Sequence, residues 1–326
     1  MNSANRIFAL IFLTLFSQGA VAQSPQSATS PDSVSVVVIT GARFLYPLLE
    51  HWIDAYVKEN PSVQLIIDSR GSNDPLHYDI LAEVRTSDDA LLRGRQVVNV
   101  GRYAVLPVTH RASPLAEAYG EKGLTVEQIK EIFFDDIFKG ESKRPVLVAY
   151  TPYRRLQRAG VPEVFSRTFG YTQKDLKGNA IAGADAHIVK ALLRDTEGVS
   201  FLPISLIYDV NSREINEGLA LLPFDLDGNN RISDDERLRG DLDELIATIE
   251  SAEPRSVKHL PVADIHLSVD KSRAHPEALA FLRWVSEQGH TALHAYGFLL
   301  PEGAVSSQGD PQDVEMDRRA DRKRGR

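Results

Sequence analysis

The sequence predicts an α/β protein with mostly parallel sheets, because apolar strands alternate with amphipathic helices. Residues 34–39 form a β-branched run interrupted only by Ser35, which is typical of a strand buried on both faces of a parallel sheet. A helix is expected at 44–59 and a second strand at 63–68. This alternation favours helices packed on the faces of a sheet. With 326 residues, the chain is long enough for two lobes.

The rest of the chain continues the alternation, and no internal repeat is visible. Further strands are expected at 103–108 and 146–150, and a short one at 218–224. Helices are expected at 125–134, 184–194, 238–249 and 276–287. The helix at 238–249 has one apolar face, formed by Leu242, Leu245, Ile246 and Ile249.

The first residues predict a signal peptide at 1–22. Arg6 precedes an apolar run at 7–16, which is too short to span a bilayer. The small residues Ala20-Val21-Ala22 then predict cleavage after Ala22 and a periplasmic location. An uncleaved anchor helix is the alternative, and the short run argues against it.

Both ends of the remaining chain have the composition of disordered segments. Residues 23–33 are rich in Ser, Pro and Gln and predict a leader, and 305–326 predict a charged tail. The basic stretch 318–326 fits a solvated tail better than a lipid contact. There is no cysteine, which excludes disulfides and thiol catalysis, and the net charge of −8 argues against nucleic acid as a partner.

Residues 225–236 fit the twelve-residue calcium loop of an EF-hand. Calcium prefers oxygen ligands from positions 1, 3, 5, 7, 9 and 12 of such a loop. Here these are Asp225, Asp227, Asn229, the backbone carbonyl of Arg231, Ser233 and Glu236. The sixth residue is Asn230 instead of the usual Gly, and Asn tolerates the positive φ that this position needs. The alternative is an acidic surface turn.

The flanks of this loop differ from those of a calcium sensor. A short strand precedes it and a helix follows it, whereas sensors change the angle between two helices. We therefore expect bound Ca²⁺ to act as a structural staple.

Two loops at predicted strand ends carry groups suited to an anion. Residues 40–43 and 69–73 combine Ser or Thr hydroxyls, glycines and arginines. In α/β sheets ligands lie beyond the carboxyl ends of strands, and helix N-termini favour anions. The same residues also make good helix caps, so the loops alone leave both interpretations open.

Motifs of the common enzyme classes are absent from the sequence. There is no Walker loop, no G-x-G-x-x-G, no H-E-x-x-H and no G-x-S-x-G. His290 and His294 are four residues apart, but no acidic residue accompanies them at metal-binding spacing. We therefore expect a protein that is not an enzyme.

Over residues 34–302 the order of segments resembles the periplasmic phosphate-binding proteins of ABC importers, which are type II periplasmic binding proteins. The family begins with T/S-G-A-x-x-F/Y-P, continues with G-S-S-G and L-T-x-E-Q-I-x-x-I-F, and ends with F-L-x-W-x-x-x-x-G-Q. The corresponding segments here are Thr40-Gly41-Ala42-Arg43-Phe44-Leu45-Tyr46-Pro47, Ser69-Arg70-Gly71-Ser72, the stretch 124–133 and the stretch 281–289.

The resemblance implies two lobes with a cleft between them. The first lobe would comprise 34–107 and 262–304, and the second 108–261, which includes the calcium loop. The protein would be a monomer that binds phosphate or a similar oxyanion and delivers it to an ABC permease in the inner membrane. The implied ligand-binding residues are Thr40, Gly41, Ala42, Arg43, Phe44, Arg70, Gly71, Ser72, Thr151 and Arg154.

The sequence departs from the family where the second lobe holds phosphate. The family has Gly-Ser-Gly-Thr at a helix start, but residues 149–156 contain no such tetrapeptide, and Arg154 or Arg155 would have to compensate. The family also has an acid that accepts the proton of hydrogen phosphate, and Glu83 is the nearest acid here. The alternative function is a binding-fold protein with an altered or lost ligand that acts in sensing or scaffolding. A hydrolase is weaker still, because the sequence offers no nucleophile and base pair.

Overall fold

The computed structural model describes residues 35–70, 74–84, 93–135 and 145–303, which all belong to one compact unit. The predicted signal peptide, leader and tail lie outside these residues, and so do Gly71 and Ser72. No helix in the described part combines the length and apolarity needed to cross a membrane.

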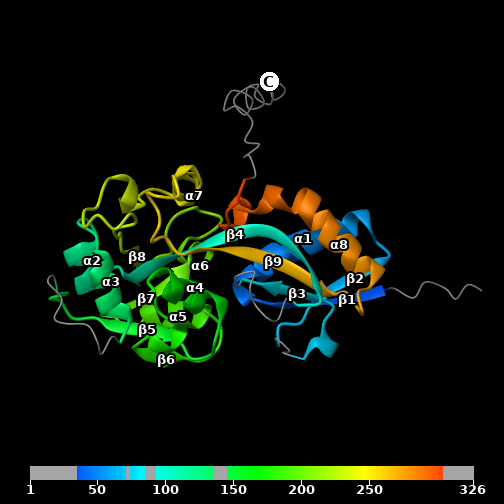
Figure 1. Ribbon diagram of the computed structural model, residues 1–326, viewed down its shortest axis with the longest axis horizontal. Helices are drawn as coiled ribbons and strands as arrows, with labels where there is room; N and C mark the ends of the chain where they lie inside the picture. Colours follow the sequence, from blue (N-terminus) through cyan, green and yellow to red (C-terminus); the bar gives the residue numbers. More distant parts are fainter. Residues whose placement is uncertain (1–34, 71–73, 85–92, 136–144, 304–326) are drawn as a thin grey trace, which may run out of the picture. The chain divides into compact units, whose positions relative to one another are not determined.

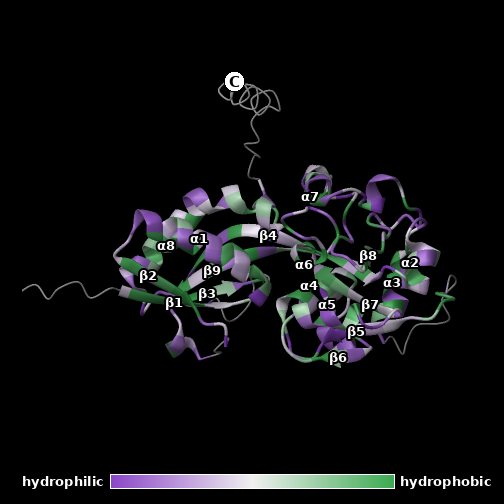
Figure 2. Cartoon of the chain, turned by 180° about the vertical axis from the view of Figure 1, so that it is seen from behind, coloured by the Kyte–Doolittle hydropathy of each residue, from purple (hydrophilic) through white to green (hydrophobic). Residues whose placement is uncertain are grey.

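The first part of the sheet holds β1 (Ser35–Gly41), β2 (Val63–Ile67) and β3 (Ile80–Glu83). β1 pairs with β2 and β3 in parallel, as expected from its β-branched sequence. Figure 2 shows hydrophobic residues along β1. β9 (Val262–Asp270) joins antiparallel to β3 and brings a late segment of the chain beside the first strands.

Two helices cover this part of the sheet (Figure 1). They are α1 (Tyr46–Glu59), which follows the 3-10 turn η1 (Arg43–Leu45), and α8 (Pro276–Gln288). Tyr56 of α1 meets Phe281 and Trp284 of α8 edge to face, with ring centroids 5.3 and 5.7 Å apart. Both helices agree with the sequence prediction to within two residues.

The long strand β4 (Arg95–His110) connects the two parts of the sheet. Residues 95–104 pair with β9, whereas 105–110 pair with β7 (Gly198–Pro203) and β8 (Leu219–Leu221). The strand order is β2-β1-β3-β9-β4-β7-β5-β6, with β8 beside β4. The predicted division into lobes at about residues 107 and 262 stays a prediction, and the change of partners along β4 falls near it.

The second part adds β5 (Thr151–Arg155) and β6 (Asn179–Ile181), which extend β7 in parallel. The pairings are therefore parallel at both ends of the strand order and antiparallel in the middle, where β3 pairs with β9 and β4 pairs with β7, β8 and β9. The sheet is thus mixed, although the sequence predicted mostly parallel pairing. The expected strand at 146–150 is wrong, since β5 begins at Thr151. The apolar run before it has no strand partner, and Leu147 is 84% exposed.

Helices α2 (Pro114–Tyr119), α3 (Val126–Phe133), α4 (Gly160–Thr168), α5 (Ala186–Leu192), α6 (Ile204–Ile207) and α7 (Leu242–Ser251) belong to the second part. An aromatic cluster forms its core, in which Phe165 of α4 stacks on Phe201 of β7 at 3.9 Å and meets Phe133 of α3 edge to face. The predicted apolar face of α7 is buried at all four positions.

Candidate functional site

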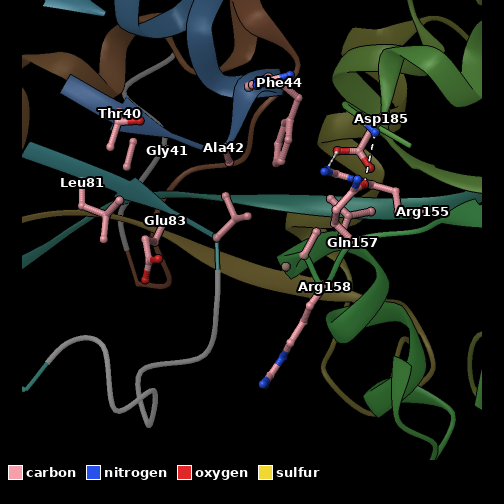
Figure 3. A pocket seen from close by; sticks show the side chains of 17 residues that line it. Thr40, Gly41, Ala42, Phe44, Leu81, Glu83, Arg155, Gln157, Arg158 and Asp185 are labelled. Atoms are coloured by element: carbon pink, nitrogen blue, oxygen red, sulfur yellow. Dashed lines mark hydrogen bonds and ion pairs between the residues drawn. The ribbon is translucent and has the colours of Figure 1, made fainter. Parts of the chain in front are cut away.

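A cavity of about 390 Å³ lies where β1 and β3 end and where α4 begins. One wall consists of residues that follow or end these strands, and the other of the loop from Arg155 to Gly160 together with Asp185 (Figure 3). Its lining residues are Thr40, Gly41, Ala42, Arg43, Phe44, Leu81, Ala82, Glu83, Val84, Arg155, Gln157, Arg158, Ala159, Gly160, Val161, Gly183 and Asp185.

The first wall depends on a close approach between β1 and β3. Gly41 has φ of 147°, and a Cβ there would stand 1.9 Å from the carbonyl oxygen of Ala82, so only glycine fits. The backbone N–H of Ala42 donates to the same oxygen at 2.9 Å. Because the strands meet in this way, the start of the η1 turn and the acid Glu83 face the same cavity.

The second wall is held in place by hydrogen bonds within its own part of the fold. Gln157 accepts the N–H of Gly183 through its side-chain oxygen at 3.1 Å. The side-chain amide of Gln173 donates to the carbonyl of Gln157 at 2.9 Å, and its oxygen accepts the N–H of Ala159 at 3.1 Å. These bonds hold the chain between β5 and α4.

Arg155 and Asp185 form an ion pair in this wall (Figure 3). Arg155 donates from Nη1 to Oδ2 of Asp185 at 3.0 Å, and the carboxylate is only 6% exposed. Burial raises the pKa of Asp185, and the charge of Arg155 opposes that rise. Part of the guanidinium charge is thus already balanced by the protein.

Five of the predicted ligand-binding residues line this cavity: Thr40, Gly41, Ala42, Arg43 and Phe44. The other described members of that set do not line it. Arg70 has a 93% exposed side chain and pairs with Asp68 at 3.2 Å, while Thr151 and Arg154 lie in β5. From this strand Arg155, and not Arg154, lines the cavity.

The helix start at the second wall is at Gly160, and residues 149–156 lie before it. Ala159 is its N-cap and Val161 its second residue, so the helix start at the cavity lies after the stretch 149–156, to which the resemblance assigned Gly-Ser-Gly-Thr. Gly160 and Asp185 were not predicted. A glycine followed by the apolar-periodic stretch 161–165 was the available signal for this helix.

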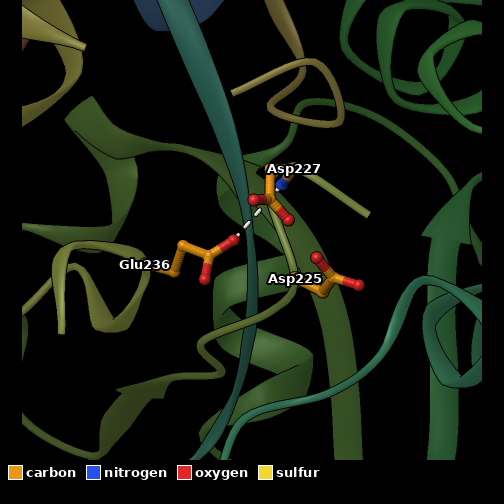
Figure 4. Close-up of side chains that lie close together, drawn as sticks. All are labelled: Asp225, Asp227 and Glu236. Carbon is orange, nitrogen blue, oxygen red and sulfur yellow. Dashed lines mark hydrogen bonds between the residues drawn. The ribbon is translucent and has the colours of Figure 1, made fainter. Parts of the chain in front are cut away.

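The calcium-loop residues come together at the other predicted site. Ligand oxygens of Asp225, Asp227 and Glu236 all lie within 4.8 Å of one another (Figure 4). The carboxylate of Asp225 is buried and accepts the N–H groups of Gly228, Asn229 and Asn230 at 2.6, 3.0 and 2.8 Å.

The geometry of the loop follows the expected turn. Asn230 has φ of 64°, as its place at the sixth position requires. Glu236 accepts N–H groups from Leu226 at 2.8 Å and Ser233 at 2.7 Å, which joins the two ends of the loop. Asn229 accepts the N–H of Arg231 at 2.7 Å.

The loop is fixed to the core by its neighbours. Asp225 donates its N–H to the carbonyl of Leu124 at 2.9 Å, within a bridge between Leu124 and Phe224. Ile232 packs closely on Gly123, because a Cβ added to Gly123 would stand 2.7 Å from Cγ1 of Ile232. Burial raises the pKa of Asp225, and a cation would oppose that effect.

No protein-family model matches the sequence, and no curated protein matches it. Solved structures do match. A Clostridium perfringens protein assigned as a phosphate ABC transporter substrate-binding protein, with phosphate bound, is 15% identical with a TM-score of 0.59. An ABC-type phosphate transport receptor from Vibrio cholerae is 13% identical with a TM-score of 0.52. Each comparison covers 82% of this chain and 100% of the other.

By description one of these proteins is a substrate-binding protein and the other a transport receptor, and at such identities the likeness concerns the fold. The predicted fold class is confirmed, since the chain shares with these two proteins the α/β fold of type II periplasmic binding proteins, whereas the bounds of the two lobes stay a prediction.

Proposed function

We propose that the protein is a periplasmic solute-binding protein of an ABC importer that binds phosphate or a similar oxyanion. The observation that carries the proposal is the convergence of Thr40, Glu83 and Arg155 with the start of α4 on one cavity. The ligand would pass to a permease in the inner membrane, and the binding protein would act as a monomer. The fold shared with two phosphate-transport proteins supports this function.

The residues of the second wall suit an anion. The guanidinium of Arg155 is planar and presents several N–H donors, which gives paired, charge-assisted bonds to a tetrahedral anion. Gly160 and Val161 are the first two residues of α4, and N–H groups at a helix start have no acceptor within the helix. The helix dipole adds partial positive charge at the same place.

Glu83 gives the cavity an acid on its first wall. The resemblance implies that such an acid accepts the proton of hydrogen phosphate. Sulfate carries no proton at neutral pH, so an ionised Glu83 would repel it without a compensating hydrogen bond. The position of Glu83 thus supports selection of hydrogen phosphate over sulfate.

Calorimetry with phosphate and sulfate tests this function. We expect phosphate to bind, and Arg155→Gln to weaken it at least tenfold, which is about 1.4 kcal/mol. Glu83→Gln should reduce the preference for phosphate over sulfate. Arg70→Gln is the matched control, since Arg70 lies outside the cavity, and it should leave both affinities unchanged. Equal losses of phosphate affinity in the Arg155 and Arg70 variants would mean that phosphate does not bind in this cavity.

We further propose that the loop 225–236 binds Ca²⁺ as a structural ion. Asp225, Asp227, Asn229, the carbonyl of Arg231, Ser233 and Glu236 would supply the oxygens. The closeness of three carboxylates supports the proposal, because their mutual repulsion favours a cation. Extracytoplasmic calcium modules bind at about 10⁻⁴–10⁻³ M.

Thermal unfolding with Ca²⁺ and with chelator tests this site. At ten times its dissociation constant, Ca²⁺ should stabilise the fold by about 1.4 kcal/mol. Glu236→Gln should abolish that response, whereas Glu253→Gln, which removes an exposed acid outside the loop, should preserve it. An identical melting temperature in calcium and in chelator would make the loop an acidic turn.

A second candidate function is a binding-fold protein whose ligand has changed or been lost and which acts in sensing or scaffolding. The ion pair between Arg155 and Asp185 favours it, because the cation of the second wall is already engaged. The same calorimetry separates the two functions. Binding of an oxyanion supports the import function, and no binding of any oxyanion by folded protein supports the second candidate.

A further inference from the structure

The cavity is large for an inorganic oxyanion. Its volume of about 390 Å³ falls in the range of pockets for organic ligands, about 300–1,000 Å³. A water molecule occupies about 30 Å³ in the liquid. Phosphate has five heavy atoms, so it would fill only a fraction of the space.

The cavity is also poor in hydroxyl groups. Of the described residues that line it, Thr40 carries the only hydroxyl, and that group lies 3.5 Å from the carbonyl oxygen of Asp68. At the start of α4, Ala159, Gly160 and Val161 carry no side-chain hydrogen-bond donor. A fully enclosed inorganic phosphate needs donors for all four oxygens, because buried acceptors without donors are costly.

The charge of the lining is nearly balanced. Arg43, Arg155 and Arg158 face Glu83 and Asp185, which leaves one positive charge in excess. Arg158 points away from the other labelled side chains in Figure 3. Of the two arginines labelled in Figure 3, Arg155 is therefore the cation that lies between the two walls.

The first wall carries two apolar side chains, Phe44 and Leu81, across from the wall that holds Arg155. Leu81 lies at the end of the cavity away from Arg155, and Phe44 lies nearer to it (Figure 3). Apolar surface of this kind gains free energy when a hydrocarbon group covers it.

We propose that the ligand is an organic phosphate or phosphonate, with its anionic group at Arg155 and the start of α4 and its carbon body against Phe44 and Leu81. This inference rests on the proposed oxyanion-binding function.

Calorimetry with inorganic phosphate, ethyl phosphate and propyl phosphate on the full chain tests the inference. Each methylene that becomes buried should tighten binding about fourfold, so propyl phosphate should bind at least tenfold more tightly than inorganic phosphate. Phe44→Leu should weaken the binding of propyl phosphate by a larger factor than that of inorganic phosphate. Inorganic phosphate that binds as tightly as propyl phosphate would overturn the inference and leave the proposed function standing. Binding of no probe by protein with a normal melting transition would overturn the proposed function as well.

Discussion

Gly160 and Val84 approach each other so closely that a Cβ on Gly160 would stand 2.5 Å from the carbonyl oxygen of Val84. Real Cβ atoms essentially never come within 3.0 Å of another heavy atom. The end of β3 and the start of α4 therefore meet at the cavity only because residue 160 has no side chain. This contact joins the two walls that hold the proposed ligand.

Gly160→Ala should separate these walls. The alanine would push against backbone and not against a flexible side-chain end, so the start of α4 has to shift. We expect at least a tenfold loss of affinity for whichever phosphate compound binds the wild type, measured by calorimetry. A normal thermal transition would show that the fold survives. Unchanged affinity would mean that the contact plays no part in binding.

Tyr103→Phe tests the hydrogen bond that holds the carbonyl group of Val84 in place. The hydroxyl of Tyr103 is fully buried and donates to the carbonyl oxygen of Val84 at 2.8 Å. Its loss leaves a buried acceptor without that donor and should cost about 1–2 kcal/mol in urea unfolding. Tyr208→Phe is the control, because the Tyr208 hydroxyl lies 3.4 Å from its acceptor, the carbonyl of Gly240, and should cost less.

Substitutions at Asn230 test the turn of the calcium loop independently of metal. The residue has φ of 64°, which costs about 1–2 kcal/mol for side chains without Asn-like local bonding. In the presence of chelator, Asn230→Ala should lower the free energy of unfolding by about 1 kcal/mol. Asn230→Gly should cost less, since glycine adopts this φ freely. Equal losses in both would show that the Asn side chain matters more than the backbone.

Asp270 should give the stability a defined pH dependence. Hydrogen bonds from the hydroxyl and N–H of Ser272, with help from Arg273, lower the pKa of Asp270 from about 3.8 to about 2. A lowered pKa means that the charged form stabilises the fold above about pH 4 and that this stabilisation disappears as the pH falls towards 2. The difference in unfolding free energy between wild type and Asp270→Asn should shrink over that interval. A difference that stays constant with pH would contradict the assignment.

Local patterns in the sequence predicted much of the fold. The apolar face of α7 follows from helical spacing. The helix expected at 125–134 is α3, which Thr125 caps through a capping box with Gln128. The positive φ of Asn230 follows from the twelve-residue loop pattern. Each of these features depends on residues within a few positions of one another.

Features set by distant partners could not be predicted in the same way. The run Val146 to Val148 has a higher β propensity than the polar segment at 151–155, yet the latter forms β5 because β6 and β7 pair with it. Arg155 and Asp185 are 30 residues apart, so only the fold shows that they form a pair. For the same reason Arg155, and not Arg154, reaches the cavity.

The position of β9 between β3 and β4 has a consequence for synthesis. Residues 262–270 are translated about 160 residues after β4, so until then β3 and the first half of β4 have unpaired edges. Open edges of this kind pair readily with other chains. The first wall of the cavity therefore cannot form before residues 262–270 have been made, and we expect a product truncated before residue 262 to aggregate even though its N-terminal strands are intact.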